Sequence, residues 1–327
     1  MGPVTEGLFA LLRGDASEIS PISPSADPLG DLDLQLALYA ANELHYGGVQ
    51  GVDDELEWDP AVSSLRRQLE DAMLEQLRAE CAPVEAGSPD DVPGLIFDLI
   101  ERDDSPPLAR YLETQADLEQ FREFVIHRSA YQLKEADPHT FTIPRISGPA
   151  KAAMVEIQAD EYGGGVADRM HSALFAKTMS RLGLDPTPNS YVDRLPASSL
   201  APVNVITLFT MRRSLRGALV GHLAGFEITS SVPNRRYANG LRRLGQDAEA
   251  TEFYDEHVEA DSVHENIAAF DLARGLARQE PDLAGEILFG VSALLATEAR
   301  FADQILASFR AERTSLVEAS ELAVSAR

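Results

Sequence analysis

The second half of the chain contains long segments in which apolar residues recur at helical spacing, and almost nothing with the alternation of a strand. These segments run over residues 150–182, 201–228, 248–279 and 281–311, and Pro-, Gly- and Asn-rich loops such as 231–240 separate them. A helical apolar stripe cannot serve as one face of a strand. We therefore predict an all-α fold in which antiparallel helices form a bundle.

The front of the chain follows the same pattern in shorter pieces. Helical apolar spacing appears over residues 32–46, 61–80 and 115–134, and turn-forming residues separate these pieces. A further breaker region, residues 137–149, contains three prolines and precedes the long helical segments. We predict an additional helical portion before the bundle.

Charge also divides the chain at this point. Residues 1–140 carry 9 basic and 29 acidic side chains, whereas residues 141–327 carry 19 and 24. We therefore divide the protein into an acidic helical N-terminal portion, 1–140, and a helical domain, 141–327.

The composition excludes several classes of function. Over 327 residues the formal net charge is −25, which would repel nucleic acids and anionic membrane surfaces. We find no signal peptide pattern, in which a basic region is followed by an apolar one, and no run of about 18 apolar residues. We therefore expect a cytoplasmic protein. The one cysteine, Cys81, allows neither an internal disulfide nor a thiolate zinc or iron–sulfur site. Any metal must therefore use nitrogen and oxygen ligands.

The segment TEFYDEHVEADSVHENIAAFD places three potential metal ligands on one helix face. His257, Asp261 and His264 stand at i, i+4 and i+7, within an arc of about 60°. Two imidazoles and a carboxylate in one stripe are typical of a metal site. The alternative is a solvated acidic face, because glutamates surround the stripe.

A second segment repeats this chemistry. Asp168 and His171 are three residues apart, and Glu161 precedes them; on a continuous helix all three would point broadly the same way. Asp168 with His171, like Asp261 with His264, is a carboxylate-x-x-histidine pair. Di-iron carboxylate bundles are built from two such pairs and single glutamates from other helices.

Glu227 is the candidate for a lone glutamate, since it ends an apolar helix face where an unpaired carboxylate would be costly to bury. Its alternative partners are Arg235 and Arg236. Glu156 and Asp160 flank Glu161 and are substitute ligands if the helix register differs.

Together these features resemble the haem-oxygenase-like di-iron oxidases, the iron-containing redox enzymes. The match lies in the order of the residues and in the gaps between them, and it covers roughly residues 145–312. The residues that carry the resemblance are Glu161, Asp168, His171, Glu227, His257, Asp261 and His264.

The resemblance implies a seven-helix haem-oxygenase-like bundle that binds two Fe(II)/Fe(III) ions and uses O2 as co-substrate. It implies that His171 and either His257 or His264 would bind opposite irons, that Glu227 would bridge or chelate, and that the three remaining carboxylates would complete the ligand shells. In the family the oxidised molecule is usually a small amine, amino acid or fatty acid.

The glycines Gly163, Gly164 and Gly165 interrupt the helix between Glu161 and Asp168. They cost roughly 3 kcal/mol of helix stability relative to alanine. We therefore expect this helix to be locally unwound until metal binds.

For the reaction we favour N-oxygenation of a small amine or amino-acid-like substrate. The alternative is oxidative C–C cleavage or desaturation of an amino or fatty acid. Candidate partners are an external electron donor and a second copy of the chain in a homodimer. From other classes, we keep a ferritin-like iron-binding protein and a helical scaffold without catalytic activity. A haem oxygenase is disfavoured, because one axial histidine would leave the carboxylates without a role.

The remaining polar candidates are assigned to structure. Glu43 and His45 stand two apart and point in different directions on a helix, and His127, His139 and His222 lack a ligand partner at helical spacing. An arginine cluster between residues 212 and 243 is expected mainly to pair with the acidic front portion rather than with a substrate carboxylate.

Overall fold

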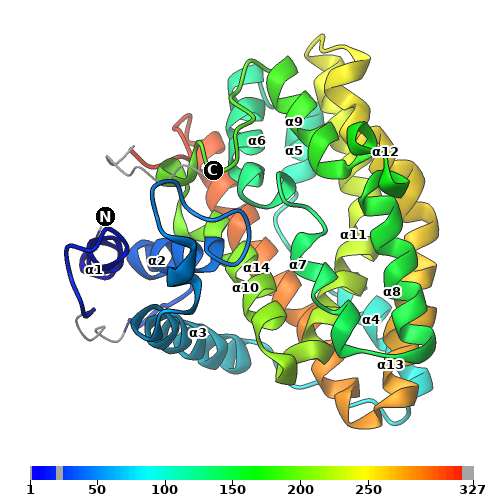
Figure 1. The fold of residues 1–327 in the computed structure, drawn as a ribbon. Coiled ribbons are helices and arrows are strands. Elements are labelled where there is room, and N and C mark those ends of the chain that lie inside the picture. The colour runs from blue at the N-terminus through cyan, green and yellow to red at the C-terminus, as the bar shows by residue number, and fades with distance from the viewer. Residues whose placement is uncertain (1, 20–24, 319–327) are drawn as a thin grey trace.

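The computed structural model of the protein describes residues 2–19 and 25–318, apart from the side chains of residues 261 and 262. Over these residues every regular element is helical, which confirms the predicted all-α class (Figure 1). The α-helices are α1 (Pro3–Leu12), α2 (Leu32–Glu43), α3 (Pro60–Glu80), α4 (Val92–Glu101), α5 (Leu108–Thr114), α6 (Leu118–Gln132), α7 (Asp137–Thr140), α8 (Gly148–Glu161), α9 (His171–Arg181), α10 (Ala197–Met211), α11 (Arg216–Arg243), α12 (Ala248–Asn266), α13 (Arg274–Gln279) and α14 (Ala284–Arg310). A π-helical segment, η8 (Ile267–Ala273), joins α12 to α13.

The long helix α11 lies at the centre of the bundle and packs along α12 and α14. Two glycines allow the approach to α14. A Cβ at Gly221 would collide with the backbone carbonyl of Ile287, and a Cβ at Gly290 would collide with that of Ala218. Any side chain at either position would therefore push the two helices apart.

The N-terminal helices α1, α2 and α3 lie together on one side of the molecule, and α8, α11 and α12 lie on the other (Figure 1). Helix α2 packs against α10, which is buried from Ala197 to Thr210. The two helices share one apolar core with α1 and α3. A second core lies among α4, α8, α11, η8 and α14, and a third lies among α5, α6, α9, α12 and the end of α14.

Two expected boundaries differ from the structure. The loop expected at Ser231–Gly240 is part of α11, which continues through Pro233. Proline removes one helical hydrogen bond and crowds the preceding turn. Here the Thr229 hydroxyl donates to the carbonyl of Gly225 (2.8 Å) and Asn234 Nδ2 donates to Ser230 Oγ (2.7 Å), which supplies side-chain hydrogen bonds on both sides of the proline.

The other difference concerns the segments predicted as single helices over 150–182 and 201–228. The first breaks into α8 and α9, and the second is divided between α10 and α11 by a short 3-10 turn, Arg213–Leu215. The break between α8 and α9 carries two candidate ligands, Glu161 and His171, at its edges, and it therefore shapes the site described below.

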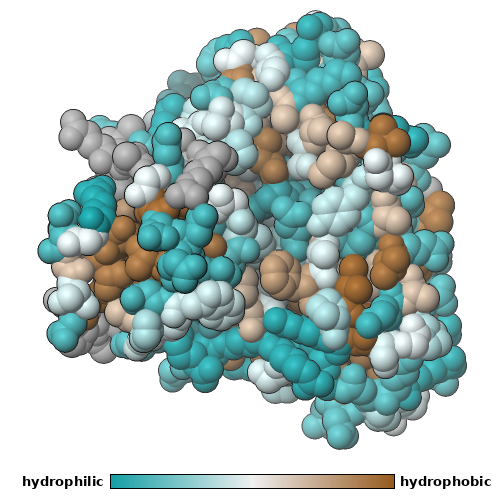
Figure 2. All heavy atoms as spheres, viewed as in Figure 1, coloured by the Kyte–Doolittle hydropathy of each residue, from teal (hydrophilic) through white to brown (hydrophobic). Residues whose placement is uncertain are grey.

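Surface charge is organised by ion pairs. Arg212 binds Glu70 (2.7 Å) and Asp71 (2.6 Å) of α3, as expected for pairing with the front portion, whereas Arg242 binds Asp255 (2.6 Å) within the domain. Figure 2 shows a mostly hydrophilic face, with apolar residues gathered over the N-terminal helices and, in smaller number, on the opposite side near α8. Among the described helices, none combines the length and the apolar character that a membrane span requires.

Candidate metal centre

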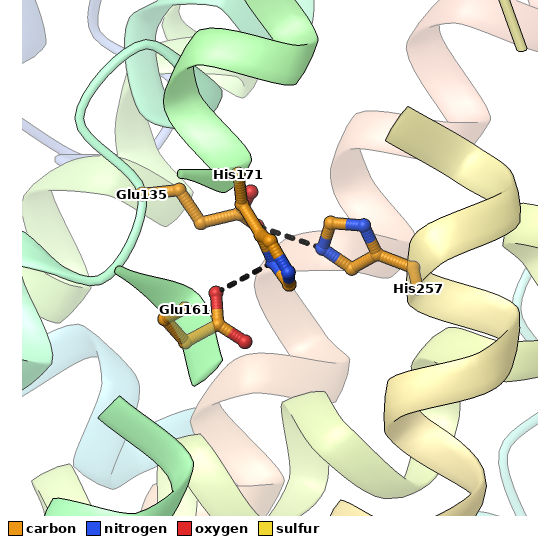
Figure 3. A group of neighbouring side chains, drawn as sticks. All are labelled: Glu135, Glu161, His171 and His257. Atoms are coloured by element: carbon orange, nitrogen blue, oxygen red, sulfur yellow. Dashed lines mark ion pairs between the residues drawn. The ribbon is translucent and has the colours of Figure 1, made fainter. Parts of the chain in front are cut away.

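Four buried side chains from separate elements form a first group of potential ligands: Glu135, Glu161, His171 and His257. Each offers one ligand atom, and these atoms all lie within 4.8 Å of one another. Figure 3 shows the side chains converging, with His171 Nδ1 2.9 Å from Glu161 Oε2 and His257 Nε2 3.5 Å from Glu135 Oε1. No residue of the group is more than 6% exposed. Four nitrogen and oxygen donors at this spacing are sufficient to bind one metal ion.

A second group shares one member with the first. It consists of Glu161, Glu227 and His264, whose ligand atoms meet the same 4.8 Å limit. His264 stands two turns after His257 on α12, and its Nδ1 lies 3.3 Å from Oε2 of Glu227 on α11. The carboxylate of Glu161 therefore lies between two adjacent sets of ligands. The family resemblance implies that Glu227 bridges or chelates, and in the structure it belongs to the second group alone.

The helix break brings Glu161 and His171 together. Helix α8 ends at Glu161, and Gly163 then adopts a φ of +63°, a conformation open to glycine but strained for other residues. The chain turns so tightly that a Cβ at Gly163 would lie 2.5 Å from the carbonyl carbon of Arg169. Helix α9 begins at His171, so that two helix ends face each other across the turn.

Asp168 is not brought to either group. It lies exposed in a 3-10 turn, Ala167–Arg169, between the two helices. The sequence argument placed Asp168 beside Glu161 and His171 because it assumed one continuous helix. With three consecutive glycines at positive φ, that helical register is lost, and Asp168 remains at the surface.

Asp261 lies within α12, one turn after His257, but its side chain is outside the described part of the structure. Its role as a ligand therefore stays a prediction. Of the two substitute ligands, Glu156 is exposed on α8. Oδ2 of Asp160 lies 3.0 Å from Nε2 of His264, within hydrogen-bonding distance. Asp160 thus contacts a candidate ligand rather than joining the group.

Hydrogen bonds orient the two histidines of α12. Nδ1 of His257 lies 2.8 Å from the carbonyl oxygen of Phe253, which can only accept, so this nitrogen carries a proton and the neutral ring would present the lone pair of Nε2 to a metal. At His264 the arrangement is reversed: Nε2 faces Asp160, and Nδ1 faces Glu227. Metal-binding histidines commonly use one nitrogen for the metal and donate the other N–H to an oxygen.

Several buried polar atoms of the two groups have no hydrogen-bond partner: Oε2 of Glu135, Nδ1 of His171 and Nδ1 of His264. His171 Nδ1 is 2.9 Å from Glu161, but the two atoms lack the angles of a hydrogen bond. Buried polar atoms are rarely left unpaired, because doing so costs about 1–3 kcal/mol each. Metal ions at the two groups would satisfy all three, and imidazole with carboxylate suits iron. The residues therefore fit a metal.

The charge balance of the metal-free site also supports metal binding. Burial by itself raises the pKa of Glu161, but the imidazoles of His171, His257 and His264 outweigh it and lower that pKa. Burial likewise favours the neutral form of His264, yet contacts with Glu227 and Asp160 raise its pKa to about 9. Without a cation, protons on histidine therefore balance the carboxylates, and a bound metal would take over that role.

Glu135 was not anticipated from the sequence. It lies in the turn between α6 and α7, outside any carboxylate-x-x-histidine pair, and on the N-terminal side of the boundary we drew at residue 140. The only local signal was a carboxylate one residue beyond a predicted helix, which is commonplace. The structure also shows that Ala136, the next residue, has a φ of +76°, so the backbone at this ligand is tightly constrained.

A cavity of about 350 Å3 adjoins the first group. Glu135 and His257 line it, together with residues of α5, α6, α11, α12 and α14. This volume is at the lower end of the range for small-molecule sites. A small organic molecule could therefore reach the first group from the cavity.

The chain matches the family of iron-containing redox enzymes over residues 122–299, more than half of its length, and it belongs to that family. The resemblance predicted from the spacing of the ligands is thus confirmed, and the protein is an oxidoreductase by family. The fold and the buried Glu and His groups agree with this assignment.

Among characterised proteins, the chain is similar to a nitrosourea synthase from Streptomyces achromogenes subsp. streptozoticus, with 29% identity over 160 residues. The match covers 49% of this chain and 34% of the synthase, so the chain spans about a third of that relative. Among solved structures, a CADD-like protein of unknown function from Nostoc punctiforme PCC 73102 superposes with a TM-score of 0.53 and 14% identity, over 66% of this chain and 96% of the other. This second likeness shows a shared fold.

Proposed function

We propose that the protein is an O2-activating non-haem di-iron oxygenase that N-oxygenates a small amine or amino-acid-like substrate. The observation that carries the proposal is the position of Glu161, which belongs to two adjacent buried groups of Glu and His ligands. A carboxylate has two oxygens and bridges metal ions readily, so a shared glutamate is the arrangement expected for two ions rather than one.

In this proposal Glu135, His171 and His257 hold the first ion, and Glu227 and His264 hold the second. Asp261 would join the second set, as the sequence resemblance implies. Two iron ions would supply the electrons and the open coordination positions that reduction of O2 requires.

Other residues of the chain orient the ligands and limit the access of water. Asp160 and the Phe253 carbonyl fix the orientation of the two α12 histidines. Phe226 and Tyr131 line the small void between the groups and limit the entry of water. For an amine the overall reaction balances as R–NH2 + O2 + 2 e− + 2 H+ → R–NHOH + H2O, with the two electrons delivered by an external donor.

The cavity favours catalysis over iron storage. It leads from the surface to Glu135 and His257 and has the volume of a small-molecule site. The matched relative is named for N-nitroso chemistry, which agrees with oxidation at nitrogen. We also propose that the protein works as a homodimer, which light scattering during gel filtration will test.

The test is iron stoichiometry after anaerobic loading with Fe(II) and desalting. We expect about two irons per wild-type chain and loss of iron from the His257→Ala/His264→Ala double variant. His127→Ala, a buried histidine outside both groups, is the matched control and should retain wild-type iron. One iron per chain, or full iron in the double variant, would refute the di-iron site.

Activity is tested separately by exposing the Fe(II)-loaded protein to O2 with a panel of amines and amino acids. Mass spectrometry should find a product heavier by one oxygen atom. Products shortened by C–C cleavage or lacking two hydrogens would instead identify the alternative reactions, and uptake of iron beyond two ions would identify storage.

A further inference from the structure

The cavity described above is lined by residues of the first group of ligands rather than of the second. Its described lining includes Glu135 and His257 of the first group, but neither Glu227 nor His264 of the second. A molecule in the cavity would therefore meet the first metal position and not the second. The residues that line the cavity between Glu135 and His257 and the surface determine which kind of molecule binds there.

Two buried polar atoms in the lining have no hydrogen-bond partner: the hydroxyl of Tyr254 and Oε1 of Gln132. Tyr254 is 2% exposed and stands three residues before His257, and Gln132 stands three residues before Glu135. Each is therefore close in sequence to the metal end of the cavity. Gln132 Oε1 can only accept a hydrogen bond, and the Tyr254 hydroxyl can accept one as well as donate one. Leaving these atoms unpaired is costly unless a ligand supplies partners.

The charged residues of the lining already have partners. Arg128 and Glu298 bind each other through two hydrogen bonds of 2.9 and 2.7 Å, and Arg236 faces Glu113 at 3.9 Å. Asp103 is exposed at the surface end and accepts from the Ser105 hydroxyl at 2.7 Å. Because Glu135 and His257 belong to the metal group, the described interior lining of the cavity offers no spare counter-ion to an ammonium or a carboxylate.

Five phenylalanines form much of the apolar part of the cavity wall. They are Phe124, Phe175, Phe226, Phe253 and Phe301. Aromatic walls favour a flat apolar ligand, because rings stack edge to face or offset on one another. Burying an ammonium among them without a carboxylate partner would cost desolvation energy, which favours a neutral nitrogen.

We propose that the cavity binds a primary aromatic amine in its neutral form. The amine donates its two N–H bonds to Gln132 Oε1 and to the Tyr254 hydroxyl oxygen, and its ring lies among the phenylalanines. An aromatic amine is neutral at pH 7, unlike an alkylamine, and keeps the lone pair that oxidation at nitrogen requires. The inference rests on the proposed function for its chemistry, but not for binding itself.

Calorimetry with three related probes tests the inference on metal-free and on anaerobic Fe(II)-loaded protein. The probes are 4-propylaniline, its N,N-dimethyl derivative, which has no N–H, and 3-phenylpropylamine, which is a cation at pH 7.5. We expect 4-propylaniline to bind most tightly. Equal or tighter binding of the dimethyl derivative or of the cation would overturn the proposal.

Two variants locate the nitrogen. Tyr254→Phe and Gln132→Met each remove one acceptor at nearly constant volume, and each should weaken 4-propylaniline roughly three- to tenfold, the effect of one hydrogen bond. Binding of the dimethyl derivative should stay as in the wild type. If neither variant changes the affinity for 4-propylaniline, the assigned acceptors are wrong. If Tyr254→Phe does not fold, the Gln132→Met variant and the three probes on the wild-type protein still test the proposal.

The two proposals fail separately. Protein that binds two irons but no 4-propylaniline leaves the di-iron proposal standing and refutes the aromatic amine. Protein that binds 4-propylaniline in the metal-free state but never binds iron refutes the proposed function alone.

Discussion

Replacement of Gly163 by alanine should destabilise the protein more than replacement of its neighbour Gly164, although both residues have nearly the same backbone conformation. Gly163 has a φ of +63° and Gly164 a φ of +61°. A Cβ at Gly163 would lie 2.5 Å from the carbonyl carbon of Arg169 and 2.7 Å from the backbone nitrogen of Met170. A Cβ at Gly164 would have no atom within 4 Å. Steric contact therefore separates the two variants.

The magnitude follows from these two terms. Placing alanine in the left-handed region costs roughly 1–2 kcal/mol, and this applies to both variants. Overpacking against a fixed neighbour costs roughly 1–3 kcal/mol more, and this applies to Gly163→Ala alone, because its contacts are backbone atoms that no rotamer change relieves. We expect the free energy of unfolding to fall by roughly 2–5 kcal/mol for Gly163→Ala and by roughly 1–2 kcal/mol for Gly164→Ala.

Urea unfolding of the metal-free proteins, followed by circular dichroism, measures the difference. The dependence on urea should be unchanged, since neither variant alters the surface exposed on unfolding. Iron loading provides a second readout: Gly163→Ala should bind iron more weakly, because the same turn sets the distance between Glu161 and His171. Equal losses of stability in the two variants would refute the close approach across this turn.

Three further predictions concern the site and the core. Glu135→Ala should remove about one iron per chain, whereas Asp168→Ala should bind iron as the wild type does, because Asp168 is exposed and outside both groups. Iron analysis after desalting measures both variants. Loss of iron from Asp168→Ala would contradict the exposed position of Asp168. Glu43→Gln should weaken iron binding, because the buried Glu43 ion pair holds Lys134, the residue before Glu135. The control is Glu252→Gln, which removes a carboxylate from the half-buried ion pair with Lys177, away from both groups. An unchanged iron titration in Glu43→Gln would argue against this role. Burial lowers the pKa of His127 to about 3, so between about pH 6.5 and 3 the unfolded state binds the additional proton. The free energy of unfolding should therefore fall as the pH drops through this window, by at most about 1.4 kcal/mol per pH unit from this residue. His127→Gln should show a shallower slope in urea unfolding at pH 6.5, 5.5 and 4.5, and an unchanged slope would exclude His127 as the source.

Local sequence patterns anticipated much of the fold, because helices depend on residues three and four apart. The periodicity of residues 248–279 predicted α12, η8 and α13 as one helical stretch, and the positions of His257 and His264 on that stretch followed from helix geometry. Long-range spacing, together with residue type, also indicated Glu161, His171 and Glu227 and the family to which the chain belongs.

The same local reasoning was wrong where backbone conformation departed from a regular element. Helical spacing assigned Asp168 to the site, but positive φ at Gly163 and its neighbours breaks the register and leaves Asp168 exposed. Proline and glycine between residues 231 and 240 suggested a loop, but packing of α11 against α12 and α14 keeps that segment helical. Tertiary contacts outweighed the local preference.

Other properties had no local signal at all. Glu135 lies in a turn, and only the packing of α6, α8, α9 and α12 brings it beside Glu161, His171 and His257. The shared position of Glu161 and the unpartnered atoms of the cavity likewise depend on segments distant in the chain. The sequence by itself therefore determined the helices, the family and most of the Glu and His residues of the two buried groups, since these depend on neighbours along the chain. Only the tertiary structure decided which carboxylates meet and what the cavity can bind, because those depend on distances between helices.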